Sequence, residues 1–260
     1  MRSERPPVLL AALAIVGVAF FILPLVGLLA RAPWETALGD LTTPEALTAL
    51  RLSFVVSIAA TALALLLGVP LAWVYARVPF RGRDVVRALT TLPMILPPVV
   101  GGVALLFAFG RRGLFGQALD AIGIRLPFTT AGAVLAATFV AMPFLVLTVE
   151  AGLRSMDRRY EDAARTLGAG RWLVFRRVTL PLIAPSVFAG AVLCWARALG
   201  EFGATITFAG NLPGTTQTLP LAVYVALETR PEVAVMLSLV LLAVSLAILI
   251  AMRDRYLRGF

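Results

Sequence analysis

Six long apolar segments, separated by polar and arginine-rich stretches, most limit how this chain can fold. A helix needs about 20 residues to cross the roughly 30 Å hydrocarbon core of a bilayer. The segments that approach this length are Val8–Ala30, Leu52–Ala76, Ala88–Gly110, Ala131–Leu153, Ser186–Gly210 and Val233–Met252. The sequence therefore predicts an all-α, polytopic membrane protein with six transmembrane helices, forming a single domain over residues 1–260.

The first apolar segment follows Arg2 and Arg5, as the apolar part of a signal peptide would. It is longer than the roughly 7–15 apolar residues of such a peptide, so we expect it to remain as a span. Arginine is enriched in cytoplasmic loops. The N-terminus, the stretches 77–87 and 154–177 and the C-terminus hold sixteen arginines, and the opposite stretches hold five. This bias predicts that both termini are cytoplasmic.

The composition argues against several classes of function. All 23 basic residues are arginine, histidine is absent, and Cys194 is the only cysteine. Without lysine the phosphate-binding loop GxxxxGK[ST] cannot occur, and without histidine an HExxH site or a Ser/His/Asp triad is impossible. The arginines lie between apolar segments, which fits membrane topology better than nucleic-acid binding. We expect no catalysis, metal, cofactor or nucleic acid in this chain.

The third apolar segment is poorly suited to a straight helix. Its sequence LPMILPPVVGG contains Pro93, Pro97 and Pro98 before two glycines. Proline removes a backbone donor, and irregular backbone at membrane depth is tolerated only against protein or a water-filled cavity. Pro97 and Pro98 are therefore candidates for a translocation path. The alternative is a kinked helix that packs closely at its glycines.

A polar stretch, Glu161–Pro185, lies between the fourth and fifth apolar segments. Small residues at Ala163 and Ala164 would let a helix sit deep in a groove of a partner, and glycine at position 168 suits a sharp reversal. The stretch predicts a short surface helix, a turn, an interfacial amphipathic segment and a return to the bilayer. The alternative is a helix that lies on anionic lipid.

The same stretch resembles the cytoplasmic EAA motif of ABC importer permeases, which reads E-A-A, three residues, G, nine residues, I-x-L-P. Asp162-Ala163-Ala164, Gly168 and Val178-Thr179-Leu180-Pro181 match its spacing, with Asp for Glu and Val for Ile. The arginine bias places this stretch in the cytoplasm, and the resemblance implies that segment 154–185 carries a coupling helix that docks on an ATP-hydrolysing subunit. The residues it assigns to this role are Glu161, Asp162, Ala163, Ala164, Gly168, Ala169, Gly170, Leu180 and Pro181.

A second motif, Ala196–Gly214, places two charged residues inside the fifth apolar segment. Arg197 and Glu201 are four residues apart, so they share a helix face and are expected to pair. Charges within a span usually face the interior of the bundle. The pair either contributes to an anion path or gate, together with Gly200 and Thr205, or neutralises itself structurally near the cytoplasmic third of the span. Glu150, near the end of the fourth segment, is expected to be a helix-end residue.

The sequence LGEFGATITF at 199–208, with LPPVVGG and FGRRGLFG, is similar to the molybdate-type permeases of the sulfate, tungstate and molybdate importers. The resemblance implies the type I (MetI-like) importer fold in the cytoplasmic (inner) membrane of a prokaryote. It also implies a homodimer, two ABC ATPase subunits that carry ATP and Mg, and a periplasmic or lipid-anchored substrate-binding protein. A sulfate/thiosulfate or tungstate permease is the alternative within this class. An ATP-independent channel or secondary carrier is the alternative outside it.

Overall fold

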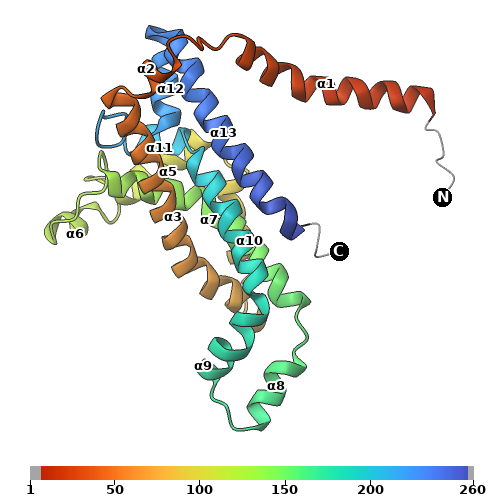
Figure 1. Cartoon of the computed structure of the whole chain (residues 1–260). Coiled ribbons are helices and arrows are strands. Elements are labelled where there is room, and N and C mark those ends of the chain that lie inside the picture. Colours follow the sequence, from red (N-terminus) through yellow and green to blue (C-terminus); the bar gives the residue numbers. More distant parts are fainter. Residues whose placement is uncertain (1–6, 257–260) are drawn as a thin grey trace.

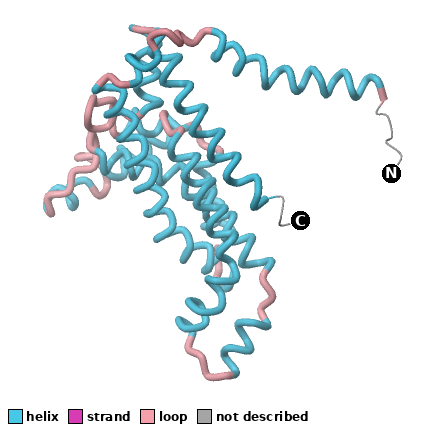
Figure 2. Tube along the Cα trace, viewed as in Figure 1, coloured by secondary structure: helices cyan, strands magenta, loops and turns pink. Residues whose placement is uncertain are grey.

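The structure, a computed structural model, describes residues 7–256, and every regular element in that range is a helix (Figures 1 and 2). Arg2, Arg5 and Arg258, which contribute to the predicted orientation of the termini, lie outside the described residues. The elements are α1 (Val8–Ala30), α2 (Ala37–Leu41), α3 (Pro44–Arg77), α4 (Arg83–Thr91), the 3₁₀ turn η1 (Leu92–Met94), α5 (Pro98–Phe109), α6 (Gly116–Ala121), α7 (Thr130–Ser155), α8 (Arg159–Thr166), α9 (Arg171–Val174), the π-helical turn η2 (Phe175–Thr179), α10 (Leu180–Leu199), α11 (Gly203–Phe208), α12 (Leu219–Thr229) and α13 (Pro231–Tyr256).

Five helices are long and apolar enough to cross a membrane, and a sixth span is possible if the bent pair α4–α5 is one span. The five are Val8–Ala30, Pro44–Arg77, Thr130–Ser155, Arg171–Leu199 and the Pro231–Ile250 part of α13. The number of predicted spans therefore agrees with the structure when the third span is counted as broken.

Helices α3, α7 and α10 form the centre of the bundle (Figure 1). Small residues dominate their contacts, and Ala60, Ala64 and Ala137 are fully buried. A Cβ on Gly190 of α10 would lie 3.3 Å from the backbone Cα of Leu145 on α7. Small side chains let apolar helices approach closely, which is how helices associate where lipid is as apolar as the side chains.

The third predicted span is broken in the structure. Helices α4 and α5 meet at an angle of 118° across η1 and the prolines that follow it. Pro97 is the N-cap of α5 and Pro98 is its first residue, a position where the missing N–H removes no helical hydrogen bond. The prolines therefore end one helix and start another, as the sequence predicts.

The fifth span differs from its prediction at both ends. It begins at Arg171 rather than Ser186, because α9 continues through η2 into α10 as one helix of 29 residues. The separate interfacial segment expected around Trp172 is thus the first part of this span. The π-helical turn ends two residues before Pro181, whose missing N–H disturbs the regular hydrogen-bond ladder. The span ends at Leu199 instead of Gly210, and α11 follows as a separate helix.

Helix α1 leaves the bundle (Figure 1), and none of its residues is buried. Phe20 and Phe21 are each 73% exposed, although the helix is apolar around its whole circumference. A helix of this kind needs lipid or another protein around it.

Candidate functional site

Helix α8 and the turn after it form the far end of the hairpin that links α7 to α9 (Figure 1). Gly168 has a φ of 84°, in the left-handed region that favours glycine. Its N–H donates to Arg165 O at 2.9 Å, and the Ala169 N–H donates to Ala164 O at 3.1 Å. These two bonds form a Schellman motif, which satisfies the last carbonyls of the helix. The predicted reversal at Gly168 is thus present, and the left-handed backbone conformation of Gly168 produces it.

The carboxylate of Glu161 attaches α8 to two other elements. Arg77, the last residue of α3, places Nε 3.1 Å from Glu161 Oε2, and the hydroxyl of Thr179 in η2 donates to Glu161 Oε1 at 2.7 Å. Arg158 reinforces the first attachment by donating from Nη2 to the carbonyl of Ala76 at 3.2 Å. The side chains of Arg77 and Glu161 are 7% and 4% exposed, so the ion pair is buried. One carboxylate therefore attaches α8 both to α3 and to the start of the fifth span.

The two neighbouring acids of the motif differ in environment. Glu161 is buried, whereas the side chain of Asp162 is 66% exposed and forms an i,i+3 pair with Arg165 at 3.3 Å. Ala163 is exposed, and Leu167 is 89% exposed in spite of its apolar side chain. Together these residues give α8 an accessible outer face with apolar and acidic groups, which is suitable for docking.

The remaining predicted coupling residues surround this face. Ala164 and Ala169 are partly buried, and Gly170 is the extended N-cap of α9. Leu180 is partly buried and Pro181 is exposed at the start of α10. Arg77 and the hydrogen-bonding role of Thr179 were not predicted. Arg77 is 84 residues from Glu161 in the chain, so no local spacing indicates their contact.

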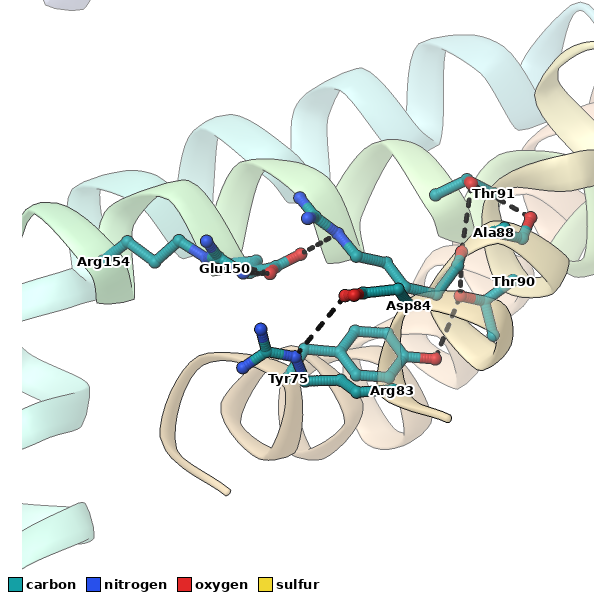
Figure 3. A network of polar contacts seen from close by, with 9 residues as sticks. Tyr75, Arg83, Asp84, Ala88, Thr90, Thr91, Glu150 and Arg154 are labelled. Carbon is teal, nitrogen blue, oxygen red and sulfur yellow. Dashed lines mark hydrogen bonds and ion pairs between the residues drawn. The ribbon is translucent and has the colours of Figure 1, made fainter. Parts of the chain in front are cut away.

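A second buried acid lies at the same end of the bundle. Glu150 of α7 is 1% exposed; its Oε1 accepts from Arg154 Nη2 at 2.7 Å, and its Oε2 is 3.0 Å from Arg87 Nε on α4 (Figure 3). Tyr75 of α3 and Thr90 of α4 also share a hydrogen bond of 3.0 Å between their hydroxyls. The expectation that Glu150 is a simple helix-end residue was incomplete, because its carboxylate also attaches the first half of the broken span to α7.

The second half of the broken span packs closely on α11. A Cβ on Gly102 of α5 would lie 2.5 Å from Thr207 Cβ and 2.9 Å from the carbonyl oxygen of Ala204. A Cβ on Gly203 of α11 would lie 2.7 Å from Pro98 Cβ. Real side chains do not approach this closely, so the contact between α5 and α11 requires glycine at both positions.

Arg197 and Glu201 form the predicted pair, with 2.7 Å between Arg197 Nη1 and Glu201 Oε2. Glu201 is 1% exposed at the side chain, and its Oε1 accepts the Ala204 N–H at 2.7 Å, which caps α11. Thr205 is buried within α11, and Gly200 is the C-cap of α10. The pair thus lies at the C-terminal end of α10, whereas α8 precedes the opposite end of this span. Its expected place in the cytoplasmic third of the span and its role in an anion path stay predictions.

Comparisons with known proteins relate this geometry to a family. Residues 64–258 match the sequence profile described as binding-protein-dependent transport system inner membrane component. The chain is 50% identical over 244 residues to the molybdenum transport system permease protein ModB of Mycobacterium tuberculosis, which covers 93% of this chain and 92% of that protein. It is 47% identical over 190 residues to ModB of Escherichia coli, covering 73% and 82% of the two chains. Identity to the Escherichia coli sulfate transport system permease protein CysT is 36% over 232 residues, covering 88% and 84%.

Solved structures share the fold. A bacterial ABC transporter involved in the import of the acidic polysaccharide alginate aligns with a TM-score of 0.73 at 20% identity, covering 97% of this chain and 96% of that one. The MetNI methionine ABC transporter aligns with a TM-score of 0.56 at 20% identity, covering 91% and 97%. The predicted all-α, type I importer fold is therefore confirmed.

Proposed function

Because this chain belongs to the family of binding-protein-dependent transport system inner membrane components, we propose that it is the permease subunit of an ATP-driven molybdate importer. The observation that carries this proposal is 50% identity to a molybdenum permease across 93% of the chain. The chain is a transport component rather than an enzyme, and ATP hydrolysis belongs to a separate subunit.

The exposed face of α8 is the proposed docking surface for the ATPase. When the ATPase subunits close on ATP and Mg, they displace α8. The displacement reaches α3 through Arg77 and reaches α9–α10 through Thr179, because both residues hold the carboxylate of Glu161. A buried ion pair with a hydrogen bond transmits displacement well, since separating its partners leaves a charge without compensation.

At the far end of α10, Glu201 would pass this movement to the broken span. α10 has 20 residues, which corresponds to about 30 Å at the helical rise. Glu201 pairs with Arg197 on α10 and caps α11, and α11 packs on α5 through Gly102 and Gly203. Tilting α10 therefore shifts α11 and α5 together, which would switch a central path lined by Pro97 and Pro98 between outward and inward access.

The proposed assembly contains two copies of this chain, two ABC ATPase subunits and an external substrate-binding protein. Among solved relatives of the fold, the alginate transporter was determined in complex with a pentasaccharide-bound periplasmic protein. The apolar surface of α1 has no buried residue, so lipid and a second copy are its natural surroundings. Orientation follows the arginine bias, with α8 and both termini in the cytoplasm of a prokaryote.

The proposed cargo follows from comparing the sequence identities of this chain to its relatives. ModB of Mycobacterium tuberculosis is 50% identical to this chain, and the sulfate permease CysT is 36% identical. Molybdate is thus the preferred cargo over sulfate or thiosulfate. Tungstate has the same charge and tetrahedral shape as molybdate, so it is the alternative cargo that is hardest to distinguish from molybdate.

Uptake by the assembled complex with a Gly168→Asp variant tests the coupling. We expect the variant to lose ATP-dependent molybdate uptake, because aspartate at a φ of 84° disturbs the turn behind α8. Wild-type uptake by a correctly assembled variant would refute docking at α8. Molybdate flux through the permease without any ATPase would instead indicate a channel or secondary carrier.

A further inference from the structure

A pocket of about 470 Å³ lies between the end of α3, helix α8 and the α9–η2 segment. Its charged lining consists of four arginines and two acids: Arg77, Arg158, Arg165, Arg171, Glu161 and Asp162. The pocket shares Asp162 with the outer face of α8 and shares Arg77, Glu161 and Thr179 with the proposed attachment of that helix, but the proposed transport cycle places no ligand in it.

The charges in this pocket are not balanced. Glu161 is paired with Arg77, and Asp162 is paired with Arg165. Arg158 bonds only to the neutral carbonyl of Ala76, and Arg171 makes no ion pair or side-chain hydrogen bond within residues 7–256. The pocket therefore holds two positive charges without an anionic partner.

A buried donor in the same pocket also lacks a partner. The side chain of Arg77 is 7% exposed, and its Nη2 has no hydrogen-bond acceptor among the described residues. Buried polar groups of this kind are rare, and each one needs an explanation such as a bound ion. Glu161 accepts from Arg77 Nε and from Thr179, but it makes no hydrogen bond with Arg77 Nη2.

We propose that this pocket binds a phosphate-class oxyanion, either as a free ion or as the headgroup of an anionic phospholipid. Guanidinium groups match the geometry of tetrahedral oxyanions and form strong charge-assisted hydrogen bonds with them. Arg171 and Arg158 supply the charge, and Arg77, whose Nη2 lacks a hydrogen-bond partner, lines the same pocket.

Aromatic groups beside the pocket suit the headgroup source. Trp73 and Phe175 line it, and Trp172, which is 72% exposed, stacks on Phe175 with 5.7 Å between ring centroids. Tryptophan is enriched where protein crosses from lipid to water, and arginines on the cytoplasmic side attract anionic lipid.

The test is calorimetric titration of the full chain in a maltoside detergent with potassium phosphate, against potassium chloride at matched ionic strength. We expect saturable phosphate binding that weakens about tenfold in Arg171→Gln, because one charge-assisted contact is lost. Arg176→Gln is the matched control, since Arg176 is exposed on η2 but does not line the pocket; its affinity should equal wild type.

Repeating the titration in lipid nanodiscs separates the two sources. If phosphate binds both in discs with phosphatidylglycerol and in discs without it, the site takes a free anion. If phosphate binding is lost only in the discs that contain phosphatidylglycerol, the site takes the lipid headgroup. The proposal is overturned if wild type shows no saturable binding beyond chloride in detergent, or if Arg171→Gln binds as wild type does. The proposal is also overturned if adding the ATPase subunit abolishes phosphate binding and the Arg171→Gln variant fails to assemble with that subunit. A carboxylate of the ATPase would then fill the pocket. None of the titrations requires transport, so their failure leaves the proposed function standing.

Discussion

The hydroxyl of Thr179 donates a hydrogen bond of 2.7 Å to Glu161 Oε1, across the turn that separates the two residues by 18 positions. The other oxygen of the same carboxylate lies 3.1 Å from Arg77 Nε at the end of α3. One buried side chain thus joins the surface helix to two long helices of the bundle. The two adjacent acids of the motif therefore differ in role. Glu161 attaches α8 to the bundle, whereas Asp162 is exposed on the outer face of α8.

Replacing each acid by its amide tests that division. Glu161→Gln should destabilise the purified chain by about 3–5 kcal/mol, because Arg77 then keeps a buried charge without a partner. Asp162→Asn should change stability by less than about 1 kcal/mol, since its pair with Arg165 is largely exposed. Thermal unfolding in detergent measures both. Equal effects from the two substitutions would contradict the assignment of Glu161 as the anchor.

Alanine at each of the two glycines of the turn distinguishes an effect of backbone conformation from an effect of steric crowding. A Cβ at Gly168 or Gly170 would meet nothing within 4 Å, so neither site is crowded. Gly168→Ala should cost about 1–2 kcal/mol, because alanine disfavours the left-handed conformation that Gly168 adopts. Gly170→Ala, at a φ of −66°, should be nearly neutral and is the control. A stable Gly168→Ala chain would mean that α8 ends differently in solution.

Alanine at Gly102 tests the close contact between α5 and α11. Gly102→Ala should lower stability by about 1–3 kcal/mol and reduce uptake, since the new methyl would overlap Thr207 and a backbone carbonyl. Gly39→Ala on α2 is the control, because a Cβ at Gly39 would meet nothing within 4 Å. Uptake kinetics and unfolding of both variants give the comparison. If Gly102→Ala changed neither stability nor uptake, the contact between α5 and α11 would not be part of the proposed relay.

A double-mutant cycle at Arg197 and Glu201 distinguishes a structural pair from an anion site. Arg197→Gln leaves Glu201 charged and buried, so it should destabilise the chain more than the double variant with Glu201→Gln does. If Arg197 also contacts the anion, the double variant should regain stability but keep a raised KM for molybdate. A double variant with normal stability and normal KM would restrict the pair to holding α11 in place.

Local patterns predicted much of this molecule. Glycine with the right spacing identified the turn at Gly168, the i,i+4 spacing identified the Arg197–Glu201 pair, and prolines identified the broken span. Each of these features depends on residues close together in the chain.

Features that depend on distant residues were not predictable. The contacts of Glu161 with Arg77 and of Glu150 with Arg87 join elements far apart in sequence, and only packing brings them together. The start of the fifth span was misplaced for a different reason. Arginines at its beginning lower the hydropathy that marks a span, but the helix itself begins at Arg171.

Uptake of labelled molybdate into proteoliposomes that contain the permease, its ATPase and its binding protein would show whether this chain is an ATP-driven molybdate permease. We expect uptake that requires ATP, is abolished by removing the ATPase, and is competed by unlabelled molybdate far better than by sulfate. Uptake that continues without ATP, or that sulfate competes as effectively as molybdate, would contradict it.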